Sequence, residues 1–351
     1  MATKVTQPST FCFSSDIGEI RFSTSDVSAR LLLKLTCNGT ATTLLDETVY
    51  PSADGTVSVT DIESMVEVLL RQHLQGTLTC TLTDTAGTAS ITSVTVLYSM
   101  ADVGTTATDF TQNHFLTTLN GPKVTAMGRE ERLYAYGATQ VTVSGTVLNA
   151  DNTTTTKSHT LNAGSTSGSV SQFDVSPSNV EDLLNLTSGR LLEYTVTAGA
   201  RKQKFELMED EVPPAPSLVF TNSFGVQEFI HCTGTHSKVS KYERTSARMA
   251  GRLRNFRVVE DRQFTANTGW LNTAMADWAD ELFRSTEVYL RVGGHTGRGI
   301  VITDSKSELS NEDGELPSYE FTYGYAQRIH NVMQPSHAGR VFDNTFDHTF
   351  N

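Results

Sequence analysis

Short runs of alternating apolar and polar residues recur along the first two thirds of the chain. Residues 19–23 and 139–147 are examples, and turn-forming residues separate such runs. Alternation with a period of two places one set of side chains on each face of a strand. Several short strands within about a hundred residues are typical of a β-sandwich. This pattern predicts an all-β (mainly) fold class.

An internal repeat divides this β-rich region into two similar halves. Residues 55–82 and 168–196 both read as strand, short helix, glycine-containing turn and strand. In the first copy, Thr60 and Glu63 have the spacing of a capping box. In the second, Ser176 can cap a helix that starts at Pro177. Self-similarity on the scale of a domain predicts tandem modules rather than a solenoid, and a short helix joining two strands fits an immunoglobulin-like topology.

The last third of the chain has a different pattern. Leu271, Met275, Trp278 and Leu282 recur at helical spacing, which predicts a helix over residues 271–284. Residues 287–292 and 299–303 predict a hairpin, and aromatic residues alternate from Tyr319 to Tyr325. We therefore expect two tandem immunoglobulin-like β-sandwiches followed by a β-rich domain with one α-helix.

Composition shifts set the expected boundaries. The prolines near residues 213–216 enforce an extended spacer between the second and third domains. The predicted units are a first sandwich at 1–105, a second at 106–211, a proline-rich linker at 212–217, an assembly domain at 218–332 and an extended C-terminal arm at 333–351.

Charge narrows the range of partners. The net charge of −12 repels phosphate backbones and anionic lipid, so we expect no nucleic-acid partner. No stretch approaches the roughly 18 apolar residues needed to cross a bilayer, so we expect no membrane insertion. The N-terminus has no apolar signal sequence, which indicates synthesis in the cytoplasm. The four cysteines, at positions 12, 37, 80 and 232, have neither zinc nor redox spacing. Buried free thiols are the favoured interpretation, although Cys37 and Cys80 could face each other across a sandwich.

A basic segment stands out within this acidic chain. It includes Lys238, Lys241, Arg244, Arg248, Arg252, Arg254, Arg257 and Arg262. Nucleic-acid binding is one interpretation, but no recognised nucleic-acid motif accompanies the charges. Docking on the acidic face of a neighbouring subunit is the favoured one.

The C-terminus repeats a Phe-Asp-x-Thr unit that places Phe342, Phe346 and Phe350 on one face of an extended segment. Such rings either pack on their own domain or clamp a neighbour by strand addition. We count these three residues, together with Lys238, Lys241, Arg244, Arg248, Arg252 and Arg254, as the expected subunit interface.

Candidate chemical sites have simpler structural explanations. The glycine-rich turn at 293–299 is followed by a predicted strand instead of the helix of a phosphate-binding loop. The acidic stretch 311–315 lacks the ligand spacing of an EF-hand. No histidine forms a recognised metal or nucleophile motif. The sequence therefore predicts no enzyme, no metal site and no cofactor.

Four phrases of the last third, at residues 222–225, 264–270, 287–290 and 302–306, resemble tail proteins of phages and prophages of Bacteroidetes-type bacteria. The resemblance implies a structural virion protein of a tail or baseplate, in contact with other copies of itself and with neighbouring tail proteins. The alternative is a cell-surface adhesin or binding module, which would present exposed aromatic residues to a host-surface glycan.

Overall fold

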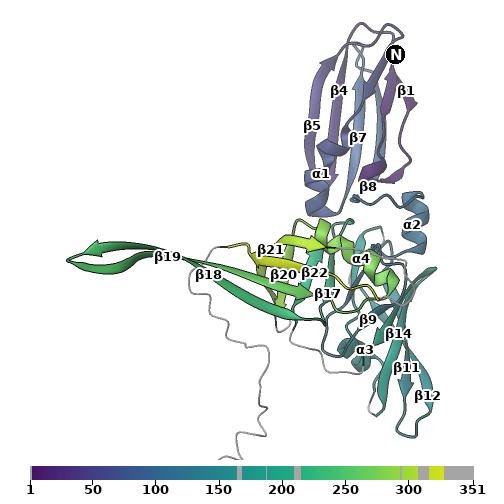
Figure 1. The fold of residues 1–351 in the computed structure, drawn as a ribbon. Coiled ribbons are helices and arrows are strands. Elements are labelled where there is room, and N and C mark those ends of the chain that lie inside the picture. The colour runs from purple at the N-terminus through teal and green to yellow at the C-terminus, as the bar shows by residue number, and fades with distance from the viewer. Residues whose placement is uncertain are drawn as a thin grey trace, which may run out of the picture.

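The computed structural model describes residues 2–163, 168–186, 188–208, 215–292, 295–306 and 316–327. The chain is mainly β, with several separate sheets, as the alternating pattern predicts. Figure 1 shows two elongated β units, a third unit with helix α4, and a long two-stranded arm that projects from the third unit. None of the described helices meets the length and hydropathy needed to span a bilayer, and the longest, α1 and α4, have 12 residues each.

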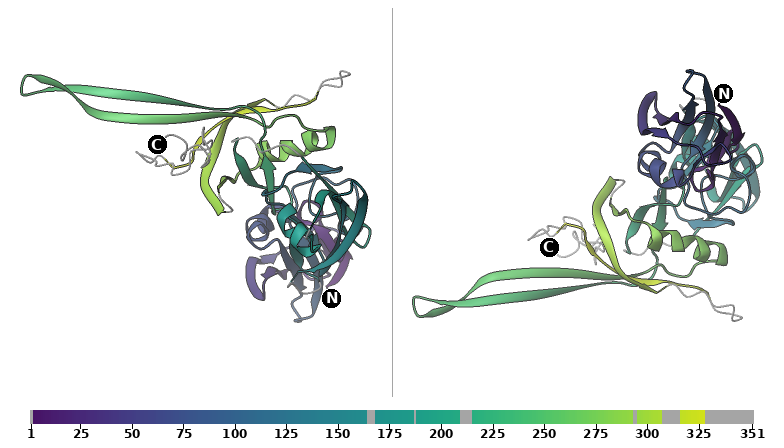
Figure 2. Two further views of the ribbon diagram at one scale, coloured as in Figure 1. Left: turned by 90° about the horizontal axis from the view of Figure 1, so that it is seen from below. Right: turned by 90° about the horizontal axis from the view of Figure 1, so that it is seen from above.

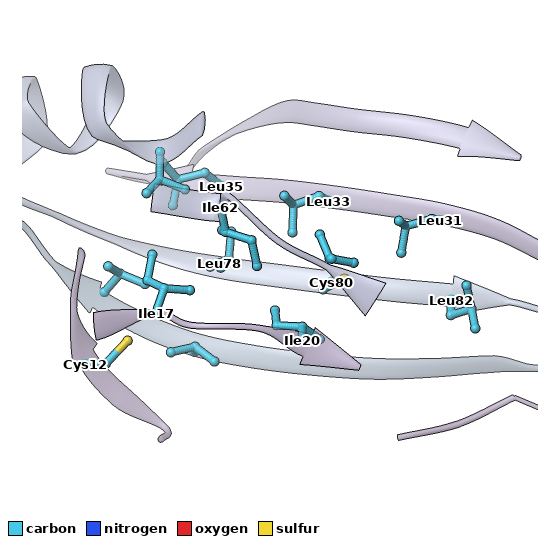
Figure 3. Close-up of a cluster of buried hydrophobic side chains, with 14 of the residues drawn as sticks. Cys12, Ile17, Ile20, Leu31, Leu33, Leu35, Ile62, Leu78, Cys80 and Leu82 are labelled. Carbon is cyan, nitrogen blue, oxygen red and sulfur yellow. The ribbon is translucent and has the colours of Figure 1, made fainter. Parts of the chain in front are cut away.

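Residues 2–99 form the first sandwich. Its sheets have the orders β1-β3-β6 and β2-β8-β7-β4-β5. The elements are β1 (Thr3–Thr6), β2 (Phe11–Phe13), a 3-10 turn η1 (Ser14–Asp16), β3 (Ile20–Ser23), β4 (Ala29–Cys37), β5 (Thr40–Val49), β6 (Thr56–Val59), α1 (Ile62–His73), β7 (Gln75–Thr83) and β8 (Ala89–Leu97). Both sheets and α1 contribute to one core (Figure 3), in which Ile20, Leu33 and Leu78 are almost fully buried.

The first helix begins differently from the sequence prediction. Its N-cap is Asp61, which adopts a left-handed conformation (φ 57°) and makes no side-chain capping bond. The predicted capping box of Thr60 and Glu63 is therefore wrong, because the chain turns sharply at Asp61. Burial of Ile62, Val66 and Leu70 against the sheets holds the helix instead.

All four cysteines are buried free thiols, as expected. Cys37 and Cys80 do not face each other across the sandwich, because they lie on β4 and β7, which are neighbours in one sheet. Burial raises the pKa of Cys80 to about 12, so this thiol is protonated at neutral pH.

Residues 123–208 form the second sandwich. A two-stranded sheet, β10-β13, faces a five-stranded sheet in the order β12-β11-β14-β15-β9. Its elements are β9 (Lys123–Thr125), β10 (Arg132–Tyr136), β11 (Gln140–Leu148), β12 (Thr154–Asn162), β13 (Val170–Asp174), α3 (Pro177–Leu183), β14 (Arg190–Ala198) and β15 (Arg201–Leu207). The order β13, α3, β14 matches β6, α1, β7, which agrees with the repeat read from the sequence. Pro177 is at the start of α3 and Ser176 is its N-cap residue, but the Ser176 side chain makes no capping bond.

Residues 217–325 build a seven-stranded sheet in the order β17-β16-β20-β21-β22-β19-β18. Its elements are β16 (Ser217–Thr221), β17 (Gln227–His231), β18 (His236–Met249), β19 (Arg252–Asn267), α4 (Thr273–Arg284), β20 (Val288–Val292), β21 (His295–Lys306) and β22 (Glu320–Tyr325). Helix α4 starts two residues later than predicted, with Asn272 accepting a capping bond from Met275 N at 2.8 Å. Trp278 and the alternating aromatics Tyr319, Phe321 and Tyr323 are buried between helix and sheet.

A separate apolar cluster joins all three units. It includes Phe13 and Leu97 of the first sandwich, Phe110 of helix α2 (Ala107–Asn113), and Phe224 of the third unit. The rings of Phe110 and Phe224 stack at a centroid distance of 5.1 Å. The sequence reading did not identify α2. Because this junction is packed like a core, it restrains the orientation of the units relative to one another.

A buried charged cluster joins the second sandwich to the third unit. Lys123 Nζ donates to Glu131 Oε2 at 2.6 Å and to the carbonyl oxygen of Phe229 at 2.8 Å, and it lies 4.5 Å from the centre of the Trp278 ring. Trp278 Nε1 in turn donates to Glu228. Burial raises the pKa of both Glu131 and Glu228. We call Lys123, Glu131, Glu228, Phe229 and Trp278 the buried charged cluster.

His231 lies beside the buried charged cluster. Its ring nitrogens contact Ser217 Oγ at 2.9 Å and the carbonyl oxygen of Glu130 at 3.1 Å. Burial, with Arg129 and Lys123 nearby, lowers the pKa of His231 to about 3. A neutral imidazole is therefore part of this junction at neutral pH.

Candidate interaction site: a basic two-stranded arm

Strands β18 and β19 form a hairpin of 14 and 16 residues, which we call the arm. The strands pair from His236 with Ala266 out to Met249 with Arg252. The two-residue turn, Ala250 and Gly251, has positive φ at both positions (48° and 76°). Positive φ at both turn residues suits the right-handed twist of a long hairpin. In Figures 1 and 2 the arm extends well away from the rest of the chain.

Only the root of the arm belongs to the larger sheet. Strand β22 pairs with β19 over Gln263–Asn267 and no farther. Among the described residues, no strand other than β18 pairs with residues 252–262 of β19, and none pairs with the outer edge of β18. The outer part of the arm is therefore a two-stranded ribbon with two free edges.

Aromatic packing fixes the root. Phe264 is 3% exposed and stacks on Tyr323 at a centroid distance of 5.0 Å. His236 Nε2 contacts Tyr323 Oη at 3.0 Å, and Tyr325 meets Phe264 edge-on. Burial raises the pKa of Tyr323, so its hydroxyl stays protonated. The arm thus leaves the body from a rigid base.

The charge of the arm is opposite to that of the remaining chain. Residues 236–267 contain eight Lys and Arg against three Asp and Glu, a net charge of +5, so all other residues together carry −17. Lys238, Lys241, Arg244, Arg248, Arg252 and Arg254, predicted as interface residues, all lie on the arm, and so do Arg257 and Arg262. From residue 244 to 258 there are five arginines, no lysine and no acidic residue.

Apolar side chains are exposed along the same ribbon. Leu253 is 72% exposed, Phe256 69% and Met249 61%. Phe256 lies at the irregularity where the pairing shifts between Thr245 and Ser246, so it is the extra residue of a bulge. The sequence did not identify these apolar residues as contact residues, because the pattern of a strand does not show which of its faces remain uncovered. The Ala250-Gly251 pair between two alternating runs was the available signal for the turn.

The other predicted contact element is the C-terminal phenylalanine repeat. Phe342, Phe346 and Phe350 lie outside the described residues, as do positions 311–315 of the acidic stretch. Within the described ranges, no group of three His, Cys, Asp or Glu side chains is arranged to hold a metal ion. Trp270, which precedes α4, is 79% exposed.

Comparisons with known proteins assign this chain to no family. No protein-family model matches it, and no curated protein matches it. Among solved structures, a tetra-tandem repeat from the extending region of a large adhesion protein is 14% identical, with 76% of this chain and 69% of the other covered, at a TM-score of 0.26.

Two further structures are similarly distant. A bacterial ice-binding adhesin is 11% identical over 76% of this chain and 92% of its own, with a TM-score of 0.16. The Dpr2 Ig1-Ig2 complex with DIP-Theta Ig1-Ig3 is 9% identical over 93% of this chain and 89% of the other, with a TM-score of 0.19. At TM-scores this low, these likenesses assign no function to the chain.

Proposed function

We propose that this protein is a structural subunit of a phage tail or baseplate, made in the host cytoplasm, that joins its neighbours through the arm. The observation that carries the assembly role is the ribbon itself. An isolated two-stranded ribbon is marginally stable in water, yet here one extends far beyond its supporting sheet and exposes Leu253 and Phe256. A neighbour that covers the arm would supply the missing contacts.

The composition of the tip supports a protein partner. Arginine, methionine and aromatic residues are enriched at protein interfaces, whereas lysine is depleted. Residues 244–258 at the tip contain five arginines, Met249 and Phe256, and no lysine. The more specific assignment to a phage tail or baseplate rests on the resemblance of four short segments of the last third to phage tail proteins.

Shortening the arm tests this proposal. Residues 241–261 would be replaced by Asn-Gly, which keeps the root pairs from Ser240–Arg262 to Lys238–Phe264 and supplies a two-residue turn. We expect the wild-type protein to form oligomers, or to join its tail neighbours, in light scattering at rising concentration. The shortened protein should stay monomeric with an unchanged melting temperature. A wild-type protein that stays monomeric both alone and with its neighbours would overturn the proposal.

A second candidate function, glycan binding by an adhesin, is favoured by one observation. Trp270 exposes 79% of its surface, and an exposed indole offers a flat face on which a sugar ring can stack. Glycan-array binding that Trp270→Ala abolishes would support this role. The matched control is Tyr50→Ala, because Tyr50 is 75% exposed on the first sandwich. Equal loss in both variants, or no binding by the wild-type protein, would count against it.

A further inference from the structure

The arm needs a partner whose charge and backbone complement it. This inference deepens the proposed assembly function and rests on it. The outer edge of β18 offers unpaired backbone groups and carries Lys238, Lys241, Arg244 and Arg248 against one acidic residue, Glu243. A strand edge with free backbone groups is a template for pairing with another strand. The complementary surface is therefore an acidic strand edge.

Two long strands outside the arm have free edges in the described structure. They are β5, at the end of the five-stranded sheet of the first sandwich, and β12, at the end of that of the second. Both are mostly exposed. In a second copy of this chain, the described strands that could pair with the arm are therefore these two and the shorter edge strands.

Charge distinguishes the two edges. Strand β12 carries Lys157 and His159 and no acidic residue, and an edge lysine protects a sheet against unwanted pairing. Strand β5 carries Asp46 and Glu47 and no basic residue. Asp46 already pairs with Arg30 of β4 at 2.7 Å, so Glu47 is the acidic side chain of β5 that attracts the basic edge of β18. Strand β12 repels that edge.

Length agrees with this choice. At about 3.3 Å per residue, the ten residues of β5 span about 33 Å and the fourteen of β18 about 46 Å. The whole of β5 can therefore pair along β18. Leu44 and Leu45 of β5 are only partly buried, so exposed arm residues such as Val239 and Tyr242 would gain apolar contacts there.

The contact has to form between molecules. In Figures 1 and 2 the arm points away from the first sandwich of its own chain, so it cannot fold back onto its own β5. Because the arm and β5 are different surfaces of one subunit, a contact between them is heterologous. Repetition of such a contact produces a ring or a filament.

We propose that β18 of one copy adds to the free edge of β5 in a second copy, so that the arm extends the five-stranded sheet of its neighbour. The chain's own charge distribution favours a second copy over an unrelated partner, because a +5 arm meets a body of −17.

A charge exchange tests the proposed pair of surfaces in the full-length protein. Glu47→Lys on β5 and, separately, Arg244→Glu on β18 should each weaken self-association at least tenfold in sedimentation. The double variant should recover most of it. Thr160→Lys on β12 is the matched control, because it adds a positive charge to the other free edge, and it should leave association unchanged.

Disulfide trapping provides a second measurement. The four native cysteines are buried, so introduced thiols would react over a low background. Thr42→Cys on β5 combined with Met249→Cys on β18, which oppose each other in the antiparallel register that places Glu47 beside Arg244, should give covalent oligomers on mild oxidation. Thr155→Cys on β12 with Met249→Cys should give none.

The outcomes separate the two proposals. If shortening the arm leaves assembly intact, both proposals fail. If shortening abolishes assembly but Glu47→Lys has no effect and Thr42 does not cross-link, the β5 contact alone is wrong. Cross-linking through Thr155, or loss of association in Thr160→Lys, would move the contact to β12 and overturn the proposal. Assembly only in the presence of a different tail protein or of nucleic acid would exclude the second copy.

Discussion

The hairpin β11–β12 and the arm β18–β19 are both long, antiparallel and exposed on their outer strand, but they differ in what supports them. Strand β11 pairs on its other side with β14 over most of its length and buries alternate residues in the core of the second sandwich. Strand β19 pairs with β22 at five positions only. The outer strand β12 exposes mainly threonine and other polar residues, whereas the arm exposes leucine, methionine and phenylalanine.

This difference separates a solvated edge from a contact surface. Exposed threonines cost little, because their hydroxyls remain hydrated. A cluster of exposed apolar side chains on a two-stranded ribbon has no such explanation and is typical of an interaction site. The root of the arm should therefore determine folding, and its outer part should determine association.

The largest expected effect is at the root. Phe264→Ala should lower the free energy of unfolding by about 3–5 kcal/mol, because it leaves a cavity beside Tyr323. Urea denaturation of the monomer would measure it. Val143→Ala in β11 is the control, because Val143 is equally buried in a hairpin that a third strand supports. If Phe264→Ala lowered the free energy of unfolding by less than about 1 kcal/mol, the root would not be part of the core.

Acid should weaken the junction that holds the third unit. The folded-state pKa of His231, about 3, lies below its unfolded value of 6.5, so the unfolded chain binds a proton first as the pH falls. The stability from the neutral ring is present above pH 6.5 and is lost as the pH approaches 3, with a loss of about 3 kcal/mol at pH 4.5.

The raised pKa values of Glu131 and Glu228 act in the opposite direction, since protonation of a buried carboxyl favours the folded state. The effect of His231 is therefore best isolated by comparison with His231→Gln. Urea denaturation at pH 7.5 and 4.5 should show a smaller acid loss in the variant. Identical losses in the two proteins would contradict this assignment.

A substitution in the turn of the arm should make the hairpin more stable. Ala250 has a φ of 48°, which asparagine tolerates better than alanine, and Asn-Gly is a favoured pair for this turn. Ala250→Asn should stabilise the ribbon by about 0.5–1 kcal/mol. Hydrogen exchange of the arm amides would measure this as slower exchange, with β11 and β12 amides unchanged. Faster exchange in the arm would show that the turn differs from the one described.

The smallest expected effect on stability is at the tip. Phe256→Ser should change the unfolding free energy of the monomer by less than about 0.5 kcal/mol, because the ring is already 69% exposed. It should nevertheless reduce self-association, measured by sedimentation. A Phe256→Ser monomer that melts much lower than wild type would mean that the tip packs on its own chain.

Much of the fold was predictable from local pattern. The strand–helix–strand repeat, the buried face of α4 with Trp278, and the alternating aromatics of β22 all follow from spacing, because periodicity determines which side chains share a face. Details that depend on backbone conformation or on non-local packing were not. The capping box at Thr60 failed because Asp61 turns left-handed, and α2 was missed because its apolar contacts come from three separate units.

The sequence by itself determined that the chain is mainly β, that two modules repeat one plan, and that a basic segment interrupts an acidic protein. Only the tertiary structure shows that this segment is a two-stranded hairpin whose outer part has two free edges in the described structure. Period-two alternation defines the two faces of a strand, but it carries no information on which strands lie at its edges, and that depends on where β22 stops pairing. The same limit applies to Cys37 and Cys80. The alternating pattern indicated that both are buried, but only the pairing of β4 with β7 shows that they lie in one sheet.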